Sequence, residues 1–405
     1  MRSVLRDVHD GATADEVDLR MRQLFPTESE FEKLLRRKLR RRSEWVAETV
    51  TSRDIGGLLE AFLTHEVGGP VAVTEVALLS GGASKMQFSF VATGETLGAQ
   101  DGSLRLVARL EPAEAHNATS RAREFQVLEL VAGSVPVPKV RWLDEDAVWF
   151  PQPVLIYDMV DGVSKPAETS TGAISGIGTR FDRRHRDVLA PQFVEHLAAL
   201  HAIKIGADVT GLDAFSLPRV DTTDTALWQL NRARRVWEED RLETFPLMDL
   251  GGDWLAENLP LLDMVSVIHG DYRSGNFLFD PGTLQVTSIL DWERSYLGDR
   301  HRDLSWTTMP AWTSLDEAGR PLTCGLIEEN ELLDSYASLT GTTIDPVRLK
   351  FYHVLNNYQL VVSALASAQR LAGLGRTHHD VVLASVEGVA YEAAQSMVAL
   401  LRDVL

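Results

Sequence analysis

The 405-residue sequence has a single cysteine, Cys324, and no long apolar run. One cysteine cannot form an internal disulfide or a cysteine zinc site, and such usage is typical of proteins in a reducing compartment. The best apolar stretch, residues 360–368, is far shorter than the roughly 18 residues of a membrane-spanning helix. Residues 1–7 also lack the apolar core of a signal peptide. We therefore expect a cytoplasmic protein without a membrane span.

Basic residues are scarce relative to acidic ones. The sequence has 40 Lys and Arg against 58 Asp and Glu, which gives a formal net charge of −18. A general polyanion binder needs the opposite balance, so we expect no nucleic-acid partner. The sequence contains no Gly-Lys-Ser/Thr, which excludes a Walker A loop, and no His-Glu-x-x-His that would indicate a zinc hydrolase.

The first fifty residues nevertheless carry a strongly basic segment. Residues 33–42 hold seven cations in ten positions, and Phe31, Leu34, Leu35 and Leu39 recur at helical spacing. Such a basic amphipathic helix can lie on a membrane surface or dock on a partner. It can also bury its apolar stripe on the acidic remainder of the chain and leave its arginines in water, which the one-sided stripe favours. Docking on a sister subunit would produce a homodimer through this helix.

The order of the predicted elements divides the chain into a strand-rich part and a helical part. Apolar runs predict strands over 71–79, 86–92, 104–110 and 154–157, with helices over 55–67 and 120–130. Residues 162–190 are rich in Gly, Ser, Thr and Arg, which favours an exposed loop. Beyond them we expect strands only within 265–291, and helices over 191–203, 225–241, 345–371 and 378–405. This order predicts a small β-rich lobe followed by a larger helical lobe.

The densest polar cluster follows an apolar run that ends at Ile268. It opens with His269-Gly270-Asp271 and offers an amide at Asn276, and Asp291 then follows a second apolar run. A carboxylate can accept the proton of an attacking hydroxyl, while amide and carboxylate oxygens are hard ligands for Mg²⁺. A single Asp in a turn usually caps it. This ordered set instead predicts phosphoryl transfer, with Asp271 as catalytic base and Asn276 and Asp291 as metal ligands.

These residues, with Asp291-Trp292-Glu293, resemble the motifs of the aminoglycoside phosphotransferase and choline kinase superfamily, over residues 52–400. The resemblance implies an α+β, protein-kinase-like bilobal fold. It also implies an N-lobe that binds the nucleotide phosphates (51–160) and a C-lobe with the catalytic loop, metal and acceptor site (161–405). The expected helical N-terminal extension (1–50) precedes the resembling part of the chain. ATP and Mg²⁺ are the implied cofactors, and a hydroxyl of a small molecule is the implied acceptor.

A glycine loop between two predicted strands is the expected cover for the nucleotide phosphates. Without a Cβ, its backbone N–H groups can approach phosphate oxygens. The residues concerned are Ser80, Gly81, Gly82, Ser84 and Lys85. Hairpins also need glycine, and family members often have asparagine where this chain has Lys85.

The same resemblance assigns a cation and a hinge. Arg109 occupies the third-strand position where kinases usually have lysine, so it is expected to reach the nucleotide phosphates, with Glu124 as its helical ion-pair partner. Met159 and Val160 follow the strand 154–157 and are expected to contact adenine. The alternatives are a surface arginine, a surface carboxylate and ordinary core packing.

Two other triplets, His185-Arg186-Asp187 and His301-Arg302-Asp303, spell the protein-kinase catalytic sequence. Neither is followed by a strand that ends in an aspartate at a suitable distance. We therefore predict that neither is a catalytic loop. Asp299 and Asp303 instead resemble the family's structural acids that brace the catalytic loop, and helix capping is the alternative.

The sequence leaves the acceptor open. Residues 135–138 and 297–299, with arginine at position 109, resemble the branch of the family associated with acyl-CoA dehydrogenases. That branch implies a hydroxyacyl-CoA or another hydroxylated metabolite as acceptor. An aminoglycoside or macrolide phosphotransferase is the alternative, which the acidic charge permits and the apolar C-terminus disfavours. A third interpretation is a kinase-fold pseudoenzyme that binds a partner through the basic helix, against which the intact catalytic and metal residues argue.

Overall fold

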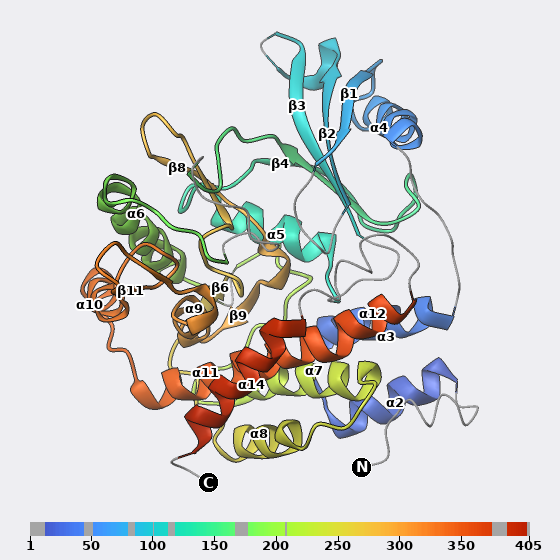
Figure 1. The fold of residues 1–405 in the computed structure, drawn as a ribbon. Helices are drawn as coiled ribbons and strands as arrows, with labels where there is room; N and C mark the ends of the chain where they lie inside the picture. The colour runs from blue at the N-terminus through green and yellow to red at the C-terminus, as the bar shows by residue number, and fades with distance from the viewer. Residues whose placement is uncertain are drawn as a thin grey trace.

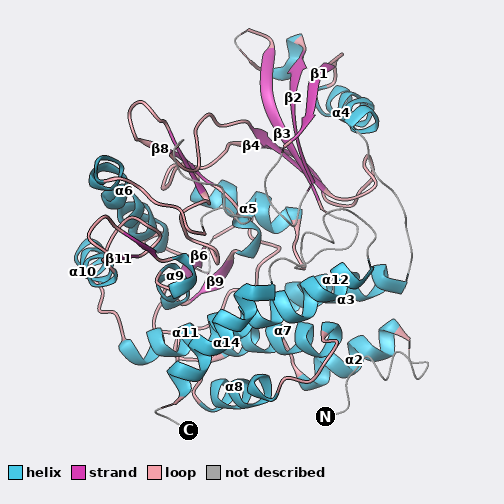
Figure 2. Ribbon diagram, in the orientation of Figure 1, coloured by secondary structure: helices cyan, strands magenta, loops and turns pink. Residues whose placement is uncertain are grey.

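The computed structural model describes residues 13–43, 52–79, 86–99, 101–111, 118–166, 177–206, 209–374 and 387–402. A twisted sheet stands at one end of the molecule and most helices gather at the other (Figure 1). Coloured by secondary structure, the strand-rich and helical parts separate clearly (Figure 2). This arrangement confirms the expected α+β fold, in which a small β-rich lobe precedes a larger helical lobe.

The sheet has five antiparallel strands in the order β1-β2-β3-β5-β4. They are β1 (Ala72–Leu78), β2 (Met86–Thr93), β3 (Ser103–Leu110), β4 (Val140–Asp144) and β5 (Val154–Asp158). Alternation along β2 buries Phe88 and Phe90 in the core that helix α4 (Ser52–Val67) covers with Phe62. Because β3 pairs with β2 on one side and β5 on the other, Arg109 on β3 lies in the middle of the sheet.

Helix α5 (Arg121–Val131) lies between the sheet and the helical lobe (Figure 1). Its N-terminus is capped by Ser120, whose hydroxyl accepts the backbone N–H of Arg123 over 3.3 Å. Val127, Leu128 and Val131 of this helix are buried in the main core. The helix therefore presents Glu124 to the lobe junction from a fixed position.

The helical lobe is built around α11 (Pro346–Val361), which packs against α8, α9 and α14. Its elements include α6 (Arg183–His201), α7 (Asp224–Asp240), α8 (Pro246–Glu257), α9 (His301–Thr307), α10 (Glu329–Thr340), a π-helical segment (Val362–Ala368), α12 (Gln369–Leu374) and α14 (Glu387–Leu401). The segment from 346 to 374 is continuously helical, as its periodicity predicts. Residues 378–386 of the last predicted helix lie outside the described residues.

Short strand pairs carry the polar cluster. Strand β6 (Ser266–Ile268) pairs with β9 (Tyr296–Gly298), and β7 (Phe277–Phe279) pairs with β8 (Val286–Ile289). A further pair joins β10 (Ser314–Leu315) and β11 (Pro321–Leu322). The expectation that strands return only within 265–291 is therefore wrong, because β9, β10 and β11 lie beyond it. Each of these is two or three residues long, too short to leave a periodic signal.

The predicted loop over 162–190 is also wrong in its last part, because α6 begins at Arg183. The carboxylate of Asp182 accepts the backbone N–H of His185 over 2.9 Å and caps the helix there. Pro191, which marks the start of the predicted helix, lies inside α6 instead. Residues 167–176 of the predicted loop lie outside the described residues.

The basic segment forms helix α3 (Ser29–Ser43), which follows α2 (Ala14–Leu24) and packs on the chain's own helical lobe (Figure 1). Phe31 and Leu35 are buried beside Val236 of α7. Burying side chains of this size stabilises by about 1.5–3 kcal/mol each. Lys38 Nζ donates to Asp240 over 3.0 Å. This confirms that the apolar stripe docks on the acidic body, although Lys38 is buried rather than left in water.

Ion pairs extend this contact along α7. The buried Arg235 pairs with Asp18 of α2 at 3.0 Å and with Glu32 of α3. Arg37 of α3 reaches Glu111, just beyond β3, at 3.1 Å. Among the described residues, no helix has both the length and the apolarity to cross a membrane.

Candidate active site

The loop between β6 and β7 carries the predicted catalytic residues. Gly270 has a φ of 80°, and a Cβ at this position would lie 2.6 Å from the carbonyl oxygen of Arg294. The left-handed backbone and the close approach both require glycine here. The turn at Gly270 brings Asp271 out of the buried strand, so that 15% of its side chain is exposed.

Three donors hold the Asp271 carboxylate. Arg273 Nε donates to Oδ1 over 2.9 Å, and Trp306 Nε1 donates to the same oxygen over 2.8 Å. Asn276 Nδ2 donates to Oδ2 over 2.8 Å and to the Asp271 carbonyl over 2.9 Å. These bonds fix the direction of both oxygens. Oδ2 accepts from one donor only among the described residues, so it keeps room for a further proton.

Asp303 of α9 is hydrogen-bonded to the backbone of the same loop. Its two oxygens accept the backbone N–H groups of His269 (2.7 Å) and Gly270 (2.8 Å), and His201 Nε2 lies 3.2 Å from Oδ2. Burial alone would raise the pKa of Asp303, but the hydrogen bond and charge of His201, with the loop N–H groups, hold it below its usual value. Asp303 therefore braces the loop that carries Asp271, which is the structural role expected of it.

His269 links the catalytic loop to the strand that precedes Asp291. Its Nδ1 accepts the backbone N–H of Asp271 over 3.1 Å, and its Nε2 donates to the carbonyl of Leu290 over 2.9 Å. The neutral ring with its proton on Nε2 satisfies both bonds. Burial lowers the pKa of His269 and thereby favours this neutral form.

Asn276 and Asp291 are brought together by the backbone, because the Leu290 N–H donates to the Asn276 carbonyl over 2.7 Å. The amide nitrogen of Asn276 is used on Asp271, which turns its amide oxygen away from that carboxylate. Asp291 adopts a φ of 67°, and 36% of its side chain is exposed. The described residues contain no cluster of three His, Cys, Asp or Glu side chains suited to a metal. Two oxygen ligands nevertheless fit Mg²⁺, which commonly takes one or two carboxylates plus phosphate and water oxygens.

Arg109 joins the sheet to this site. Its guanidinium is buried, with Nε 3.2 Å from Glu124 Oε1 and Nη2 3.0 Å from Asp291 Oδ1. The expected Arg109–Glu124 pair is therefore present. Sequence reasoning did not find the two residues that complete the cluster, namely Arg121, 2.7 Å from Glu124, and Glu293, 3.4 Å from Arg109. Burial opposes the charge, but the Glu124 and Asp291 carboxylates outweigh it and raise the pKa of Arg109.

The residues that are expected to form the hinge follow β5 directly. The backbone N–H of Met159 donates to the Arg105 carbonyl over 2.9 Å, so Met159 can reach adenine only through its carbonyl or side chain. Met159 and Val160 are both partly exposed. The glycine loop of Ser80, Gly81, Gly82, Ser84 and Lys85 lies outside the described residues, between the end of β1 and the start of β2.

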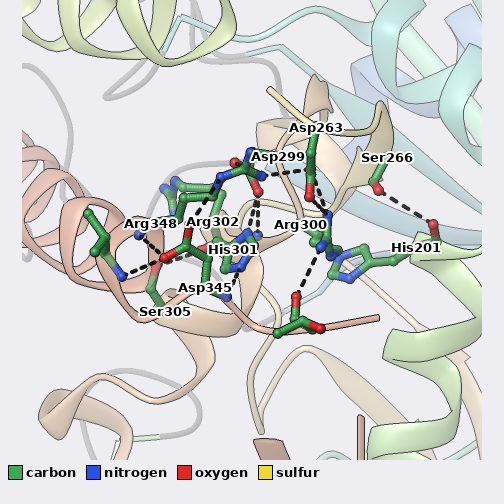
Figure 3. A network of polar contacts seen from close by, with 12 residues as sticks. His201, Asp263, Ser266, Asp299, Arg300, His301, Arg302, Ser305, Asp345 and Arg348 are labelled. Atoms are coloured by element: carbon green, nitrogen blue, oxygen red, sulfur yellow. Dashed lines mark hydrogen bonds and ion pairs between the residues drawn. The ribbon is translucent and has the colours of Figure 1, made fainter. Parts of the chain in front are cut away.

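A polar network fixes the start of α9 (Figure 3). His301 Nδ1 donates to Asp299 over 2.7 Å, and Nε2 accepts the backbone N–H of the residue that caps α11. Arg300 donates to both oxygens of Asp263, at 2.8 and 3.0 Å. Burial would raise the pKa of Asp263, but the hydrogen bonds from Arg300 and Arg348 lower it to about 2. The second kinase-like triplet thus lies in a supporting network rather than in a catalytic loop.

Comparison with known proteins connects this geometry to a family. A model of the phosphotransferase enzyme family matches residues 75–326. Mouse acyl-CoA dehydrogenase family member 10 is 25% identical over 213 residues, which cover 51% of this chain and 18% of that protein. The chain spans less than a third of the acyl-CoA dehydrogenase family relatives that it matches first.

Solved structures of aminoglycoside phosphotransferases share the fold. A protein of this type from Ralstonia eutropha JMP134 is 23% identical, with a TM-score of 0.60 over 86% of this chain and 98% of that chain. A thermostable mutant of APH(4)-Ia, in a ternary complex with ADP and hygromycin B, is 18% identical, with a TM-score of 0.51 over 84% of this chain and 98% of that chain. These likenesses confirm the protein-kinase-like fold.

Proposed function

We propose, because the chain belongs to the phosphotransferase enzyme family, that it transfers the γ-phosphoryl group of ATP to a hydroxyl group of a small molecule. The observation that carries this proposal is the arrangement around Asp271. Its carboxylate is hydrogen-bonded to Asn276, and the backbone beside Asp291 is hydrogen-bonded to the same asparagine. A base and two oxygen ligands are therefore held together on one loop and the end of one short strand, as phosphoryl transfer requires.

Asp271 acts as the base in this proposal. With Oδ1 held by Arg273 and Trp306, Oδ2 accepts the proton of the acceptor hydroxyl as its oxygen attacks the γ-phosphorus. The bond between the γ-phosphorus and the bridging oxygen breaks, and ADP leaves with that electron pair. Most of the rate in such a reaction comes from positioning and charge stabilisation. The rigid hydrogen bonds around Asp271 supply the positioning.

The nucleotide end of the site contains Arg109. Its buried guanidinium is expected to face the nucleotide phosphates, with Glu124 fixing its orientation from α5. When Mg²⁺ is bound to the nucleotide, it neutralises charge that develops on the phosphate oxygens. Asn276 and Asp291 are the residues that would hold it. We expect residues 80–85 to cover the phosphates and Met159 and Val160 to contact adenine.

The acceptor proposed first is a hydroxyacyl-CoA or another hydroxylated metabolite, which the similarity to acyl-CoA dehydrogenase family members supports. The similarity to APH(4)-Ia, whose complex contains hygromycin B, makes an aminoglycoside acceptor the second candidate. A single cysteine in the whole sequence is typical of proteins in a reducing compartment, which supports a cytoplasmic location. A homodimer through α3 stays a prediction. The apolar stripe of α3 packs on its own chain, so such a dimer would have to use another face of this helix.

Phosphate transfer from ATP in the presence of Mg²⁺ and a panel of hydroxyl compounds tests the proposal. Asp271→Ala should keep ATP binding but lower turnover by roughly 10²–10⁴-fold, because a positioned proton acceptor is lost. Asp187→Ala is the matched control, since its 66%-exposed side chain belongs to a kinase-like triplet on α6. Near-normal turnover by Asp271→Ala with the preferred acceptor would refute the assignment of the base.

A further inference from the structure

Two arginines from different parts of the chain stack on Trp306, whose indole N–H donates to Asp271, and a third interacts with their charge. The guanidinium carbon of Arg294 lies 4.7 Å from the Trp306 ring centroid, and that of Arg302 lies 5.0 Å from it. The indole N–H of Trp306 is the 2.8 Å donor to Asp271 Oδ1. Arg232 of α7 packs over Phe31 at 4.0 Å, and its charge interacts with those of Arg294 and Arg302. Positive charge therefore collects beside the proposed base.

These arginines have no carboxylate partner in the described part of the chain. Arg302 is only 2% exposed and donates to the Gln359 amide oxygen over 2.8 Å, while its Nε and Nη1 are buried with no hydrogen-bond partner. Arg294 and Arg232 are partly buried. Unpaired buried guanidinium groups are costly, and most buried arginines are paired with carboxylates.

Nearby carboxylates offset only part of this charge, because each has partners of its own. The charge of Glu28 acts on Arg232, and the charges of Asp303 and Asp271 act on Arg302. Glu28 pairs with Arg123, and Ser216 donates its backbone N–H to the same side chain. Asp303 accepts from the catalytic loop, and Asp271 accepts from Arg273. Burial and the like charge of Arg294 lower the pKa of Arg232 to about 9, and burial with Arg294 lowers that of Arg302 to about 10. A chain with a net charge of −18 thus keeps incompletely neutralised positive charge at one place.

We propose that Arg294 and Arg302, with Arg232 beside them, bind an anionic group, a carboxylate or a phosphate, of the molecule whose hydroxyl Asp271 deprotonates. This inference rests on the proposed phosphotransfer. Guanidinium groups bind carboxylate and phosphate oxygens through paired N–H donors, and an incoming anion would relieve the repulsion between the arginines. The nucleotide phosphates have their own cation in Arg109, which lies on the sheet side of Asp291. Arg294 and Arg302 flank Trp306 on α9 instead.

This arrangement also limits the distance between the anionic group and the reacting hydroxyl of the acceptor. Because the arginines are separated from Asp271 by one indole ring, the anionic group must lie close to the reacting hydroxyl within the acceptor. A polycationic amino sugar would meet like charge at this position and is disfavoured. The N-terminal extension contributes to the arginine cluster, because the ring of Phe31 on α3 packs against the guanidinium of Arg232.

Matched pairs of acceptors test this proposal in the full-length protein. Glycolate, lactate and 3-hydroxybutyrate are each compared with the corresponding neutral amide in Mg²⁺–ATP phosphate transfer. We expect kcat/KM to be about 10- to 100-fold higher for the best acid than for its amide, as charge-assisted hydrogen bonds predict. Equal use of acid and amide, or preference for cationic amino sugars, would overturn the inference while leaving phosphotransfer intact.

Single-residue variants test whether Arg294 and Arg302 cause the preference for the acid over the amide. Arg294→Gln and Arg302→Gln should bring the acid-to-amide ratio close to one while transfer to the amide persists. Arg183→Gln, whose 87%-exposed side chain lies at the start of α6, should keep the ratio. If Arg302→Gln fails to fold, Arg294→Gln alone decides, because its side chain is only partly buried. A ratio unchanged in Arg294→Gln would exclude these arginines from acceptor binding.

Sulfate provides a readout that does not depend on turnover. At matched ionic strength, replacing sodium chloride by sodium sulfate should raise the Tm of the wild-type protein more than that of Arg294→Gln, because exclusion of sulfate from the surface stabilises both proteins and only the wild type also binds the ion at this site. Saturating Mg²⁺–ATP should leave this sulfate effect in place, since the site belongs to the acceptor. Loss of the effect with Mg²⁺–ATP would assign the arginines to the nucleotide phosphates and overturn the proposal. Sulfate binding without transfer to any hydroxyl compound would support the anion site and refute the proposed phosphotransfer.

Discussion

The carboxylate of Asp303 accepts the backbone N–H of His269 over 2.7 Å, which joins helix α9 directly to the catalytic loop. The same carboxylate accepts the N–H of Gly270 over 2.8 Å, so two successive peptide groups are held by one side chain. Because Trp306 on the same helix donates to Asp271, α9 fixes both the backbone and the side chain of the proposed base. The position of Asp271 therefore depends on a helix that begins thirty residues later in the sequence.

Asp303→Asn should lower turnover more than it lowers nucleotide binding. An asparagine offers one acceptor and one donor where two N–H groups need acceptors, so one buried N–H loses its partner at a cost of about 1–3 kcal/mol. The shifted loop should reduce kcat by about 10²-fold, as small misplacements of reacting groups do. Steady-state kinetics with calorimetric ATP binding measures both effects. Asp280→Asn, in a turn where Asp280 accepts the N–H groups of Gly282 and Thr283, is the control and should change neither.

Asp291→Asn should weaken Mg²⁺-dependent ATP binding by about tenfold or more, since groups that merely orient metal ligands are worth about 10–100-fold in metal affinity. Asp271→Asn should weaken that binding much less, because Asp271 is proposed to act on the acceptor rather than on the nucleotide. Isothermal calorimetry with ATP, with and without Mg²⁺, separates the two variants. Equal effects would contradict the division of roles between the two aspartates.

His353 should make the protein less stable in mild acid. Burial lowers its pKa from 6.5 to about 4, so the folded state resists protonation that the unfolded chain accepts. Its contribution to stability is complete above pH 6.5 and is lost as the pH falls from 6.5 towards 4, about 2 kcal/mol of it by pH 5. Urea midpoints at pH 7 and pH 5 measure this loss. Between pH 7 and pH 5, His353→Gln should lose less stability than the wild-type protein. The control His185→Gln, at the start of α6, should lose as much stability as the wild-type protein.

Removal of residues 1–50 should lower the Tm, because it uncovers the face of α7 that Leu35 and Phe31 bury and leaves Arg235 and Asp240 without their partners on α2 and α3. ATP affinity should change little, since no described contact of these helices reaches Arg109 or Asp291. Thermal melting and sedimentation of the full-length and the truncated protein measure the change in stability and in oligomeric state. Unchanged melting and assembly, together with binding of the full chain to anionic vesicles at physiological salt, would favour the membrane interpretation.

The grouping of Asp271, Asn276 and Asp291 could be predicted from the sequence, because all three lie on one loop and at the end of one short strand, within about twenty residues of each other. The Arg109–Glu124 pair could also be predicted, since a strand cation and a helix carboxylate recur in the resembling family. The helices and longer strands followed from periodicity. Strands β9 to β11 and the start of α6 did not, because two- and three-residue strands and a single capping aspartate leave too weak a local signal.

Only the tertiary structure decided what surrounds these residues. The bonds of Trp306 and Asp303 to the catalytic loop join positions more than thirty residues apart, which no local pattern specifies. Arg232, Arg294 and Arg302 come from separate elements, and in the sequence they are three arginines among many acidic residues. Their shared neighbourhood and their lack of ion-pair partners among the described residues depend on how the chain brings these distant positions together. The sequence therefore determined the order of the polar residues on which the proposed phosphotransfer rests, whereas packing decided which arginines lie together beside the proposed base.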